Sequence, residues 1–287
     1  MPPVETVSAI RTRRVRASLR SDGWRIVLLG AALLGAVIGS ALGNRPAEQF
    51  FLAIGLAIVL AAVVLLVIWI RASGAAEDDF LTTWGAAKGL SFVESPSIGS
   101  GTPLLRQGDT RKAENGLVGE IDAHPAMLCH YTYTVVTHST DSNGVQTRQE
   151  TNHPFTVVRL DDVRASVARM TMHPRNVLDR GWLDRADSAL SSNHVVELES
   201  TDLQRHYKLE VGDDVPDMQV RQVFEPTFIV WCLDQKDVLF ELENGELVVA
   251  VKHHLSEQGP LDALLEQSRA VLTRIAAASA LADRSLS

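Results

Sequence analysis

The 287-residue chain has a formal net charge of −8, with 46% apolar and 22% charged residues, but both kinds of residue are unevenly distributed. Residues 72–287 contain 19 Lys and Arg against 32 Asp and Glu. Their net charge of −13 argues against nucleic acid as a partner, because binding to a phosphate backbone needs clustered basic side chains. Cys129 and Cys232 form no CxxC pair, so neither a disulfide framework nor a thiolate metal site is expected.

The first 70 residues have the pattern of a membrane segment. A basic tail, residues 1–25, contains six arginines and precedes two runs without charged residues, 26–43 and 50–70. A helix needs about 20 residues to cross the bilayer, so the two runs predict a transmembrane helical hairpin over residues 26–70. The tail and first run also fit a cleaved signal peptide, but the second complete run argues against that alternative.

The arginines predict how the hairpin is oriented. Basic residues near the ends of spans are retained in the cytoplasm, and most arginines here precede the first span. We therefore expect a multi-pass protein of the inner (plasma) membrane, with its N-terminus and C-terminal domain cytoplasmic. Trp24 with Arg25, and Trp69 with Arg71, are the predicted anchors at the membrane interface.

Small residues recur every four positions in both runs, which lets helices approach closely. These residues are Gly35, Gly39, Gly43, Ala53, Ala57 and Ala61. The favoured interpretation is that the two stripes pack against each other within one hairpin, and the alternative is an oligomerisation face. Neither run contains a charged residue, which argues against an ion pathway and indicates an anchor.

The remaining sequence predicts one soluble domain over residues 77–280. Small residues at 72–76 indicate a linker, residues 80–88 have helical spacing and end at Gly89, and 95–103 reads as a loop. Strands are expected around 127–135, 155–158, 167–172, 195–198 and 207–211, with a turn at 141–144. In the first of these strands Cys129 belongs to the apolar face and His130 to the polar face.

Helices and a hairpin are expected in the last 70 residues. Residues 217–235 have helical spacing that Pro226 interrupts, so two short helices or one kinked helix are predicted. Asn244 and Gly245 between two apolar stretches are the clearest hairpin signal in the chain. An amphipathic helix follows Pro260. Strands and helices without regular βαβ alternation predict an α+β domain with a mostly antiparallel sheet.

No catalytic, cofactor-binding or metal-ligating residues are predicted. The histidines form no HExxH motif, and His253 and His254 are neighbours on a strand, so they point to opposite faces. The same geometry separates Cys129 from His130. The acidic pairs at 161–162 and 213–214 are typical of turns and helix caps.

Three segments carry a family resemblance: VELESTDLQRHYKLEV at 196–211, FEPTFIVWCLDQ at 224–235 and VLFELENGELVVAVKH at 238–253. Together they resemble an uncharacterised bacterial family of membrane-anchored proteins, which have one or two N-terminal transmembrane helices and a C-terminal domain of unknown function. The resemblance covers residues 77–275. It implies the architecture and assigns no catalytic residues.

Three functions stay open at this point. The leading hypothesis is a non-enzymatic cytoplasmic module, tethered to the bilayer, that binds a protein partner or another copy of itself. The second is a hydrolase-like enzyme whose site is assembled from distant loop residues such as His124, His153 or Asp109. The third is a sensor of a lipid or small ligand, which requires a deep apolar cavity.

Overall fold

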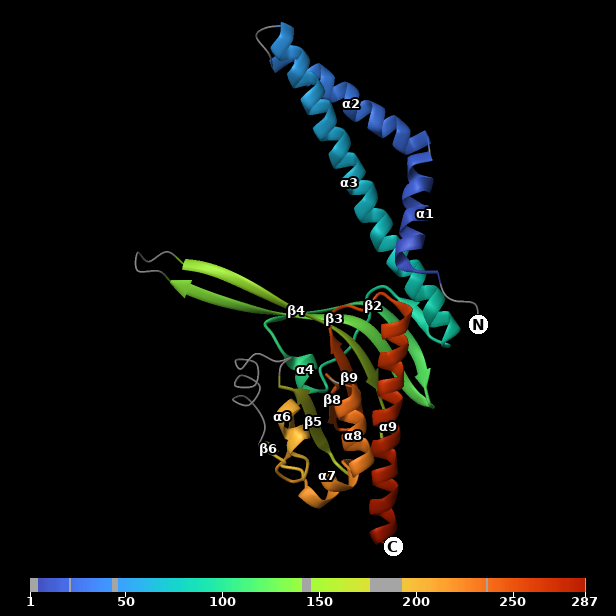
Figure 1. Ribbon diagram of the computed structural model, residues 1–287, viewed down its shortest axis with the longest axis vertical. Helices are drawn as coiled ribbons and strands as arrows, with labels where there is room; N and C mark the ends of the chain where they lie inside the picture. The colour runs from blue at the N-terminus through green and yellow to red at the C-terminus, as the bar shows by residue number, and fades with distance from the viewer. Residues whose placement is uncertain are drawn as a thin grey trace. The chain divides into compact units, whose positions relative to one another are not determined.

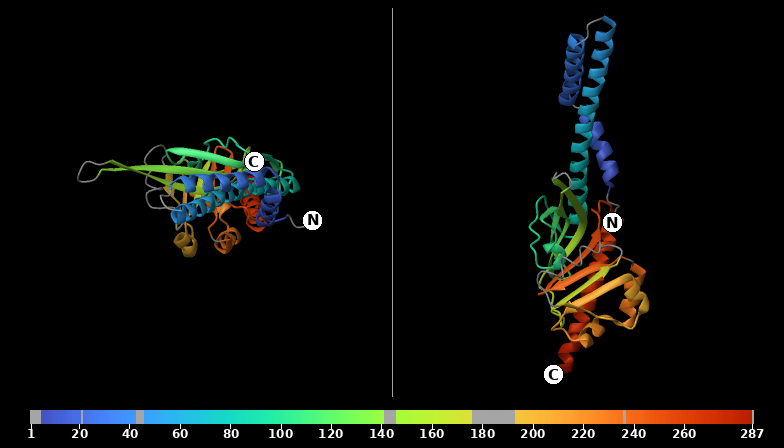
Figure 2. Two further views of the ribbon diagram at one scale, coloured as in Figure 1. Left: turned by 90° about the horizontal axis from the view of Figure 1, so that it is seen from above. Right: turned by 90° about the vertical axis from the view of Figure 1, so that its left-hand side faces the viewer.

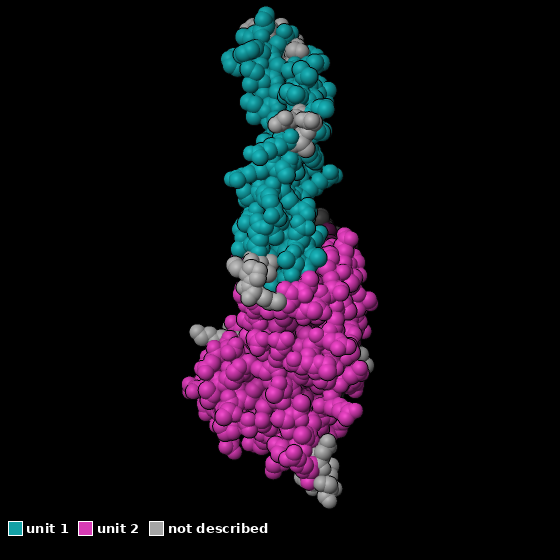
Figure 3. All heavy atoms as spheres, turned by 90° about the vertical axis from the view of Figure 1, so that its right-hand side faces the viewer, with its two compact units in different colours: residues 1–84 teal, residues 85–287 magenta. Residues whose placement is uncertain are grey.

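The computed structural model describes residues 5–20, 22–42, 46–140, 146–175, 193–235 and 237–286. The chain divides into two compact units, Met1–Trp84 and Gly85–Ser287, which Figure 3 shows in different colours. Unit 1 is helical, and unit 2 contains the sheet.

Unit 1 consists of α1 (Val7–Arg20), α2 (Asp22–Leu42) and the part of α3 (Pro46–Ala87) that ends at the unit boundary. Within α3, residues Gln49–Ala87 form a helix long and apolar enough to cross a membrane. Its most apolar 18-residue window has a mean hydropathy of 3.3 and is 6% buried. Apolar side chains left this exposed need lipid or another apolar cover, so the described part of the chain has one candidate membrane span.

The predicted two-span hairpin is not confirmed. In α2 the described apolar stretch is Ile26–Ile38, shorter than a full span. The side chain of Arg25 and the surroundings of Gly39 lie outside the described structure, as do Gly43 and the start of the predicted turn at 44–45.

The predicted linker at 72–76 is wrong, because α3 continues through it to Ala87. Alanine is the best helix former, and the single glycine in the stretch, Gly74, costs only about 1 kcal/mol in a helix interior. The predicted end of the helix is confirmed. Gly89 adopts a positive φ of 78°, and the N–H of Leu90 donates to the carbonyl oxygen of Gly85 at 2.8 Å.

Unit 2 is built on a nine-stranded sheet in which all pairings are antiparallel, in the order β1-β2-β3-β4-β9-β8-β5-β7-β6 (Figure 1). The strands are β1 (Ser91–Val93), β2 (Thr110–Ile121), β3 (His124–Thr140), β4 (Gln146–Leu160), β5 (Arg169–Pro174), β6 (Asn193–Val195), β7 (Tyr207–Gly212), β8 (Leu239–Glu243) and β9 (Glu246–Lys252). The predicted α+β class with an antiparallel sheet is confirmed.

Helices lie on one face of the sheet (Figure 2). These are α7 (Asp217–Val223), α8 (Pro226–Gln235) and α9 (Gln258–Leu286), and the short α6 (Thr201–His206) precedes β7. The break at Pro226, the β8–β9 hairpin and the amphipathic C-terminal helix are confirmed as predicted. The apolar stripe of α9 is buried: Leu261, Leu264, Leu265, Val271, Leu272 and Ile275.

The other face is covered in part by the segment before β2, which contains α4 (Pro103–Arg106). Leu104 and Leu105 of α4 belong to a buried cluster with Cys129, Tyr131 and other residues of β3, β4, β8 and β9. Cys129 is therefore core, as expected, and burial raises the pKa of its thiol to about 12. His130 was assigned to a polar face, yet it is also buried, because the sheet is covered on both faces there.

Five local features were missed or misplaced. The strands β1 and β2 and the helices α4 and α6 were not predicted, and β6 ends at Val195 where a strand over 195–198 was expected. In α6 the hydroxyl of Ser200 accepts a hydrogen bond from the N–H of Leu203 at 3.2 Å, a helix-capping pattern. Residues 141–144, the predicted turn between β3 and β4, lie outside the described residues.

Candidate functional site

Charged side chains are concentrated in a buried layer on the α4 face of the sheet, across strands β8, β5 and β7. Directly opposite residues in antiparallel strands point to the same face. Arg169 pairs with Glu243, Thr171 pairs with both Glu241 and Glu210, and His173 pairs with Lys208. The alternate residues, such as Met172 and Phe240, point to the helix-covered face and are buried.

Glu241 and His173 form the deepest part of this charged layer. Glu241 is fully buried and His173 is 2% exposed, and the carboxyl Oε1 lies 3.4 Å from the imidazole Nε2. Burial raises the pKa of Glu241 to about 7, against the lowering effects of the Leu104 N–H and of Arg106. Burial, together with the charge of Lys208, lowers the pKa of His173 to about 3. At neutral pH the imidazole of this pair is therefore uncharged, and the carboxyl group has a pKa close to the pH.

Two glutamates of the layer hold α4 on the sheet. The N–H of Leu104, in the first turn of α4, donates to Oε2 of Glu241 at 2.7 Å. At the other end of α4, Nη2 of Arg106 lies 2.6 Å from Oε2 of Glu243, and Arg169 contacts the second oxygen of Glu243. Glu243 is only 4% exposed, so its charge is compensated by two guanidinium groups in a poorly solvated position.

The arrangement of the layer indicates a structural role. One cavity is a pocket lined by residues between 175 and 209, and another is an open hollow of about 590 Å³ along α1. Neither Glu241 nor His173 lines them, so a substrate bound there has no access to this pair. The sequence missed the layer because Phe240–Glu243 alternates apolar and acidic residues, the usual pattern of a half-exposed strand. The available signal was alternation in β5, where Arg169, Thr171 and His173 alternate with two methionines, and where Arg169 lies opposite Glu243 of β8.

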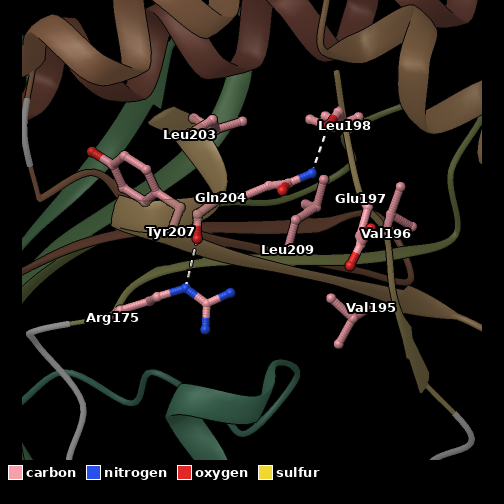
Figure 4. A pocket seen from close by; sticks show the side chains of 9 residues that line it. All are labelled: Arg175, Val195, Val196, Glu197, Leu198, Leu203, Gln204, Tyr207 and Leu209. Atoms are coloured by element: carbon pink, nitrogen blue, oxygen red, sulfur yellow. Dashed lines mark hydrogen bonds between the residues drawn. The ribbon is translucent and has the colours of Figure 1, made fainter. Parts of the chain in front are cut away.

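A small pocket lies beside β7, at the edge of the sheet (Figure 4). Its cavity volume is about 70 Å³, and its walls are mainly apolar, including Leu198, Leu203 and Leu209. Gln204 spans it, donating from Nε2 to the carbonyl oxygen of Leu198 at 2.6 Å, and Nε of Arg175 donates to the Gln204 carbonyl oxygen at 2.8 Å. Small-molecule sites commonly have volumes of about 300–1,000 Å³, so this pocket has room for very small molecules only.

The residues suggested for an enzyme site have local structural roles. Oδ2 of Asp109 accepts a hydrogen bond from the N–H of Val136 at 2.7 Å. The His153 ring stacks on Tyr133 at 4.6 Å between centroids, and Nδ1 of His124 lies 3.1 Å from the carbonyl oxygen of Asp161. His124 lies nine residues along β3 from Tyr133, about 30 Å at 3.4 Å per residue, so it does not share a site with His153.

The remaining histidines form no metal site in the described part of the chain, where no group of three His, Cys, Asp or Glu side chains is placed to hold an ion. His130 stacks on His254 with a centroid separation of 4.5 Å, and its Nε2 lies 2.9 Å from the carbonyl oxygen of Leu255. Burial lowers the pKa of His130. These contacts hold the chain segment that follows β9 against the sheet.

Within unit 1, the structure brings some of the predicted anchor and packing residues into contact. A Cβ atom on Gly35 would lie 2.6 Å from Cα of Ala57, so α2 and α3 approach closely at this point. The guanidinium group of Arg11 lies 5.4 Å from the centre of the Trp69 ring, and Arg14 forms a 2.5 Å ion pair with Asp79. Trp69 and Arg71 are exposed and Trp24 is half-buried. Their predicted role as anchors at the membrane interface stays a prediction.

The most exposed regular structure of unit 2 is a two-stranded arm, formed by the ends of β3 (residues 135–140) and β4 (residues 146–152). The two strands pair with each other from Val135–Thr151 to Thr140–Gln146. The pairing of β2 with β3 stops at Thr134, and that of β9 with β4 stops at Phe155. The arm projects beyond the sheet in Figure 1 and in the left view of Figure 2.

No family model and no curated protein matches the chain. Among solved structures, the chain is similar to the mycobacterial trehalose monomycolate transport factor A. The two share 10% sequence identity with a TM-score of 0.47, over 70% of this chain and 95% of the other.

Proposed function

We propose that the protein is a non-enzymatic module, tethered to the inner membrane, that binds a protein partner through the β3–β4 arm. The observation that carries this proposal is the arm itself. All seven residues of its β4 strand, 146–152, are exposed. The arm therefore extends beyond the sheet without burying apolar surface that would stabilise it. An isolated two-stranded ribbon is marginally stable in water, so a docking role explains its length better than a role in the core does.

The arm has the chemistry of a surface for adding a strand. Edge strands offer unpaired N–H and C=O groups, and an extended segment of a partner gains main-chain hydrogen bonds by pairing with them. The β4 edge of the arm contains no proline or lysine between Gln146 and Asn152, and its two charged residues, Arg148 and Glu150, have opposite signs. Prolines and unpaired charges, lysine above all, commonly protect edge strands from unwanted pairing.

The membrane topology proposed for this module is the one predicted from the sequence. It comprises a cytoplasmic tail over 1–25, spans over 26–43 and 50–70, and a cytoplasmic domain over 77–280. The apolar α3 helix supports one span, and the excess of arginines before residue 26 supports the orientation. Protease added outside intact cells is expected to leave unit 2 uncut, and cleavage within unit 2 would contradict this topology.

The docking role is tested by placing a photo-crosslinking residue at Gln149, in the middle of the β4 edge, in cells that make the full chain. Glu120, an exposed residue of β2 outside the arm, is the matched control position. We expect a defined protein adduct from position 149 and none of that size from position 120. The same yield of the same adducts from both positions would contradict docking through the arm.

The two alternative functions, a lipid sensor and an enzyme, each require a cavity of a particular kind. A lipid sensor needs an apolar cavity long enough for an acyl chain. The pocket beside β7 measures about 70 Å³, and the larger hollow along α1, about 590 Å³, is lined mostly by polar and basic side chains such as Arg13, Arg16 and Arg20. An enzyme needs convergent polar groups next to a cavity, and the buried pair Glu241 and His173 lines neither the pocket beside β7 nor the hollow along α1.

A further inference from the structure

We infer that the partner of the arm is a second copy of this chain, paired in antiparallel orientation through residues 146–152 of β4. This inference rests on the proposed function, since it identifies the partner of the same arm. In the resulting dimer, the strand order at the interface would be β3-β4 of one copy followed by β4-β3 of the other.

The two edges of the arm differ, and the difference selects β4. On the β3 edge, Asp109 occupies the position of a partner strand: its N–H donates to the carbonyl oxygen of Thr134 at 2.8 Å, and its carboxylate accepts from the N–H of Val136 at 2.7 Å. On the β4 edge, the last main-chain contact from the neighbouring segment is the N–H of His253 donating to Pro154. Residues 146–152 lie beyond this contact and extend for about 24 Å at 3.4 Å per residue.

The sequence of this edge is complementary to itself. With Gln149 opposite Gln149 of the second copy, Arg148 lies opposite the second copy's Glu150, and Glu150 lies opposite its Arg148. Thr147 then faces Thr151, and Gln146 faces Asn152. Opposite-charge pairs and threonine pairs are the cross-strand combinations that stabilise antiparallel sheets.

Only one register gives these pairs. Arg148 and Glu150 already form a 2.5 Å ion pair within one strand, on one face, with their side chains 61% and 52% exposed. A second copy in the register centred on Gln149 would extend this pair into an alternating group of four charges. A slip of two residues in either direction instead places Arg148 opposite Arg148 or Glu150 opposite Glu150, which is repulsive.

Membrane tethering makes a short interface sufficient. A seven-residue strand pairing buries little surface, so it is expected to be weak between molecules free in solution. Two copies held on the same bilayer by α3 encounter each other at a much higher effective concentration, which favours a weak contact without any additional surface.

The inference is tested with the purified full chain in vesicles of phosphatidylcholine and phosphatidylglycerol, where no other protein is present. The chain's own thiols, Cys129 and Cys232, are buried, so Gln149→Cys adds the accessible one. Copper-catalysed oxidation is expected to link Gln149→Cys into a disulfide dimer. Thr137→Cys, on β3 of the same arm, is the control. In the dimer it would lie three strand spacings, about 14 Å, from its counterpart, too far for a disulfide.

Charge swaps test the register. In the Gln149→Cys background, Arg148→Glu or Glu150→Arg alone is expected to reduce the dimer about tenfold, because two attractive pairs become repulsive. The double variant R148E/E150R restores opposite charges at both positions and is expected to restore the dimer. All of these positions are exposed, so the substitutions leave the core of the fold intact.

The outcomes separate this inference from the proposed function. Equal linkage at positions 149 and 137, or single charge swaps without effect, would overturn pairing between copies. If the purified chain forms no dimer while position 149 crosslinks another protein in cells, self-pairing is wrong and docking through the arm stands. If position 149 yields no adduct in either experiment, both proposals are wrong.

Discussion

The carboxyl group of Glu241 is expected to make the stability of unit 2 depend on pH in a direction opposite to that of most acidic residues. The perturbation is Glu241→Gln, which removes the titrating group. The amide oxygen of the new side chain retains an acceptor for the N–H of Leu104, 2.7 Å from the carboxylate in the native protein. Glu120→Gln, at an exposed position of β2, is the matched control.

The sign follows from where the proton is held. Burial raises the pKa of Glu241 from 4.5 to about 7, so the folded protein keeps a proton that the unfolded chain loses as pH rises above 4.5. Stability from this group is therefore fully present below pH 4.5 and is lost between pH 4.5 and 7. At 1.36 kcal/mol per pKa unit, the loss amounts to about 3 kcal/mol.

His173 acts in the opposite direction. Its pKa is lowered from 6.5 to about 3, so its contribution to stability rises with pH across that interval. The wild-type protein alone would therefore show a partly cancelled pH dependence. The Glu241→Gln variant retains His173, so the contribution of His173 cancels when its stability is subtracted from that of the wild type. The difference reports the effect of Glu241, including its interaction with His173.

The assay is urea unfolding of the full chain in detergent, followed by tryptophan fluorescence at pH 4.5, 5.5 and 7. The free energy of unfolding of wild type is expected to fall relative to Glu241→Gln by about 3 kcal/mol over this range. The Glu120→Gln control is expected to track wild type at each pH. A constant difference between wild type and Glu241→Gln across the three pH values would refute the reasoning.

Three further substitutions test other parts of the structure. Gly35→Val is expected to destabilise the contact between α2 and α3 by about 1–3 kcal/mol through overpacking against Ala57. Gly30→Val, with open space around it, is not expected to destabilise this contact, and thermal unfolding in detergent measures both variants. Tyr207→Phe removes a hydroxyl that bonds the main chain of α8 and of residue 238, and is expected to cost about 1–3 kcal/mol in urea unfolding. Glu243→Ala removes the carboxylate partner of two partly exposed arginines and is expected to cost about 2 kcal/mol and to speed amide exchange in α4.

Each of these has a result that contradicts it. Equal destabilisation by the two valine variants would mean that α2 and α3 do not meet at Gly35. An unchanged unfolding midpoint for Tyr207→Phe would mean that water replaces the hydroxyl. If exchange in α4 is unaffected by Glu243→Ala, the segment is held by its apolar contacts alone.

Local features of both units followed from the sequence because short-range rules decide them. Asn244 and Gly245 take positive φ angles of 52° and 82°, which these residues tolerate in a tight hairpin turn. Pro226 begins α8, since a proline removes an N–H that the first turn of a helix does not use. The charge-free run of residues 50–70 likewise marked the apolar helix α3.

The tertiary structure decided which polar groups are buried and which edges are free. The sequence placed His130 on a polar face, and Phe240–Glu243 has the alternation of a half-exposed strand. His130, Glu241 and Glu243 are nevertheless all buried, because coverage of both faces of the sheet depends on segments more than 100 residues apart. The strand β5 lies between β8 and β7, which no local pattern specifies. The free edge of β4 likewise depends on where β9 stops pairing, at Phe155. Periodicity therefore determined which residues share a side of a strand, while strand order and coverage determined whether that side is wet or dry.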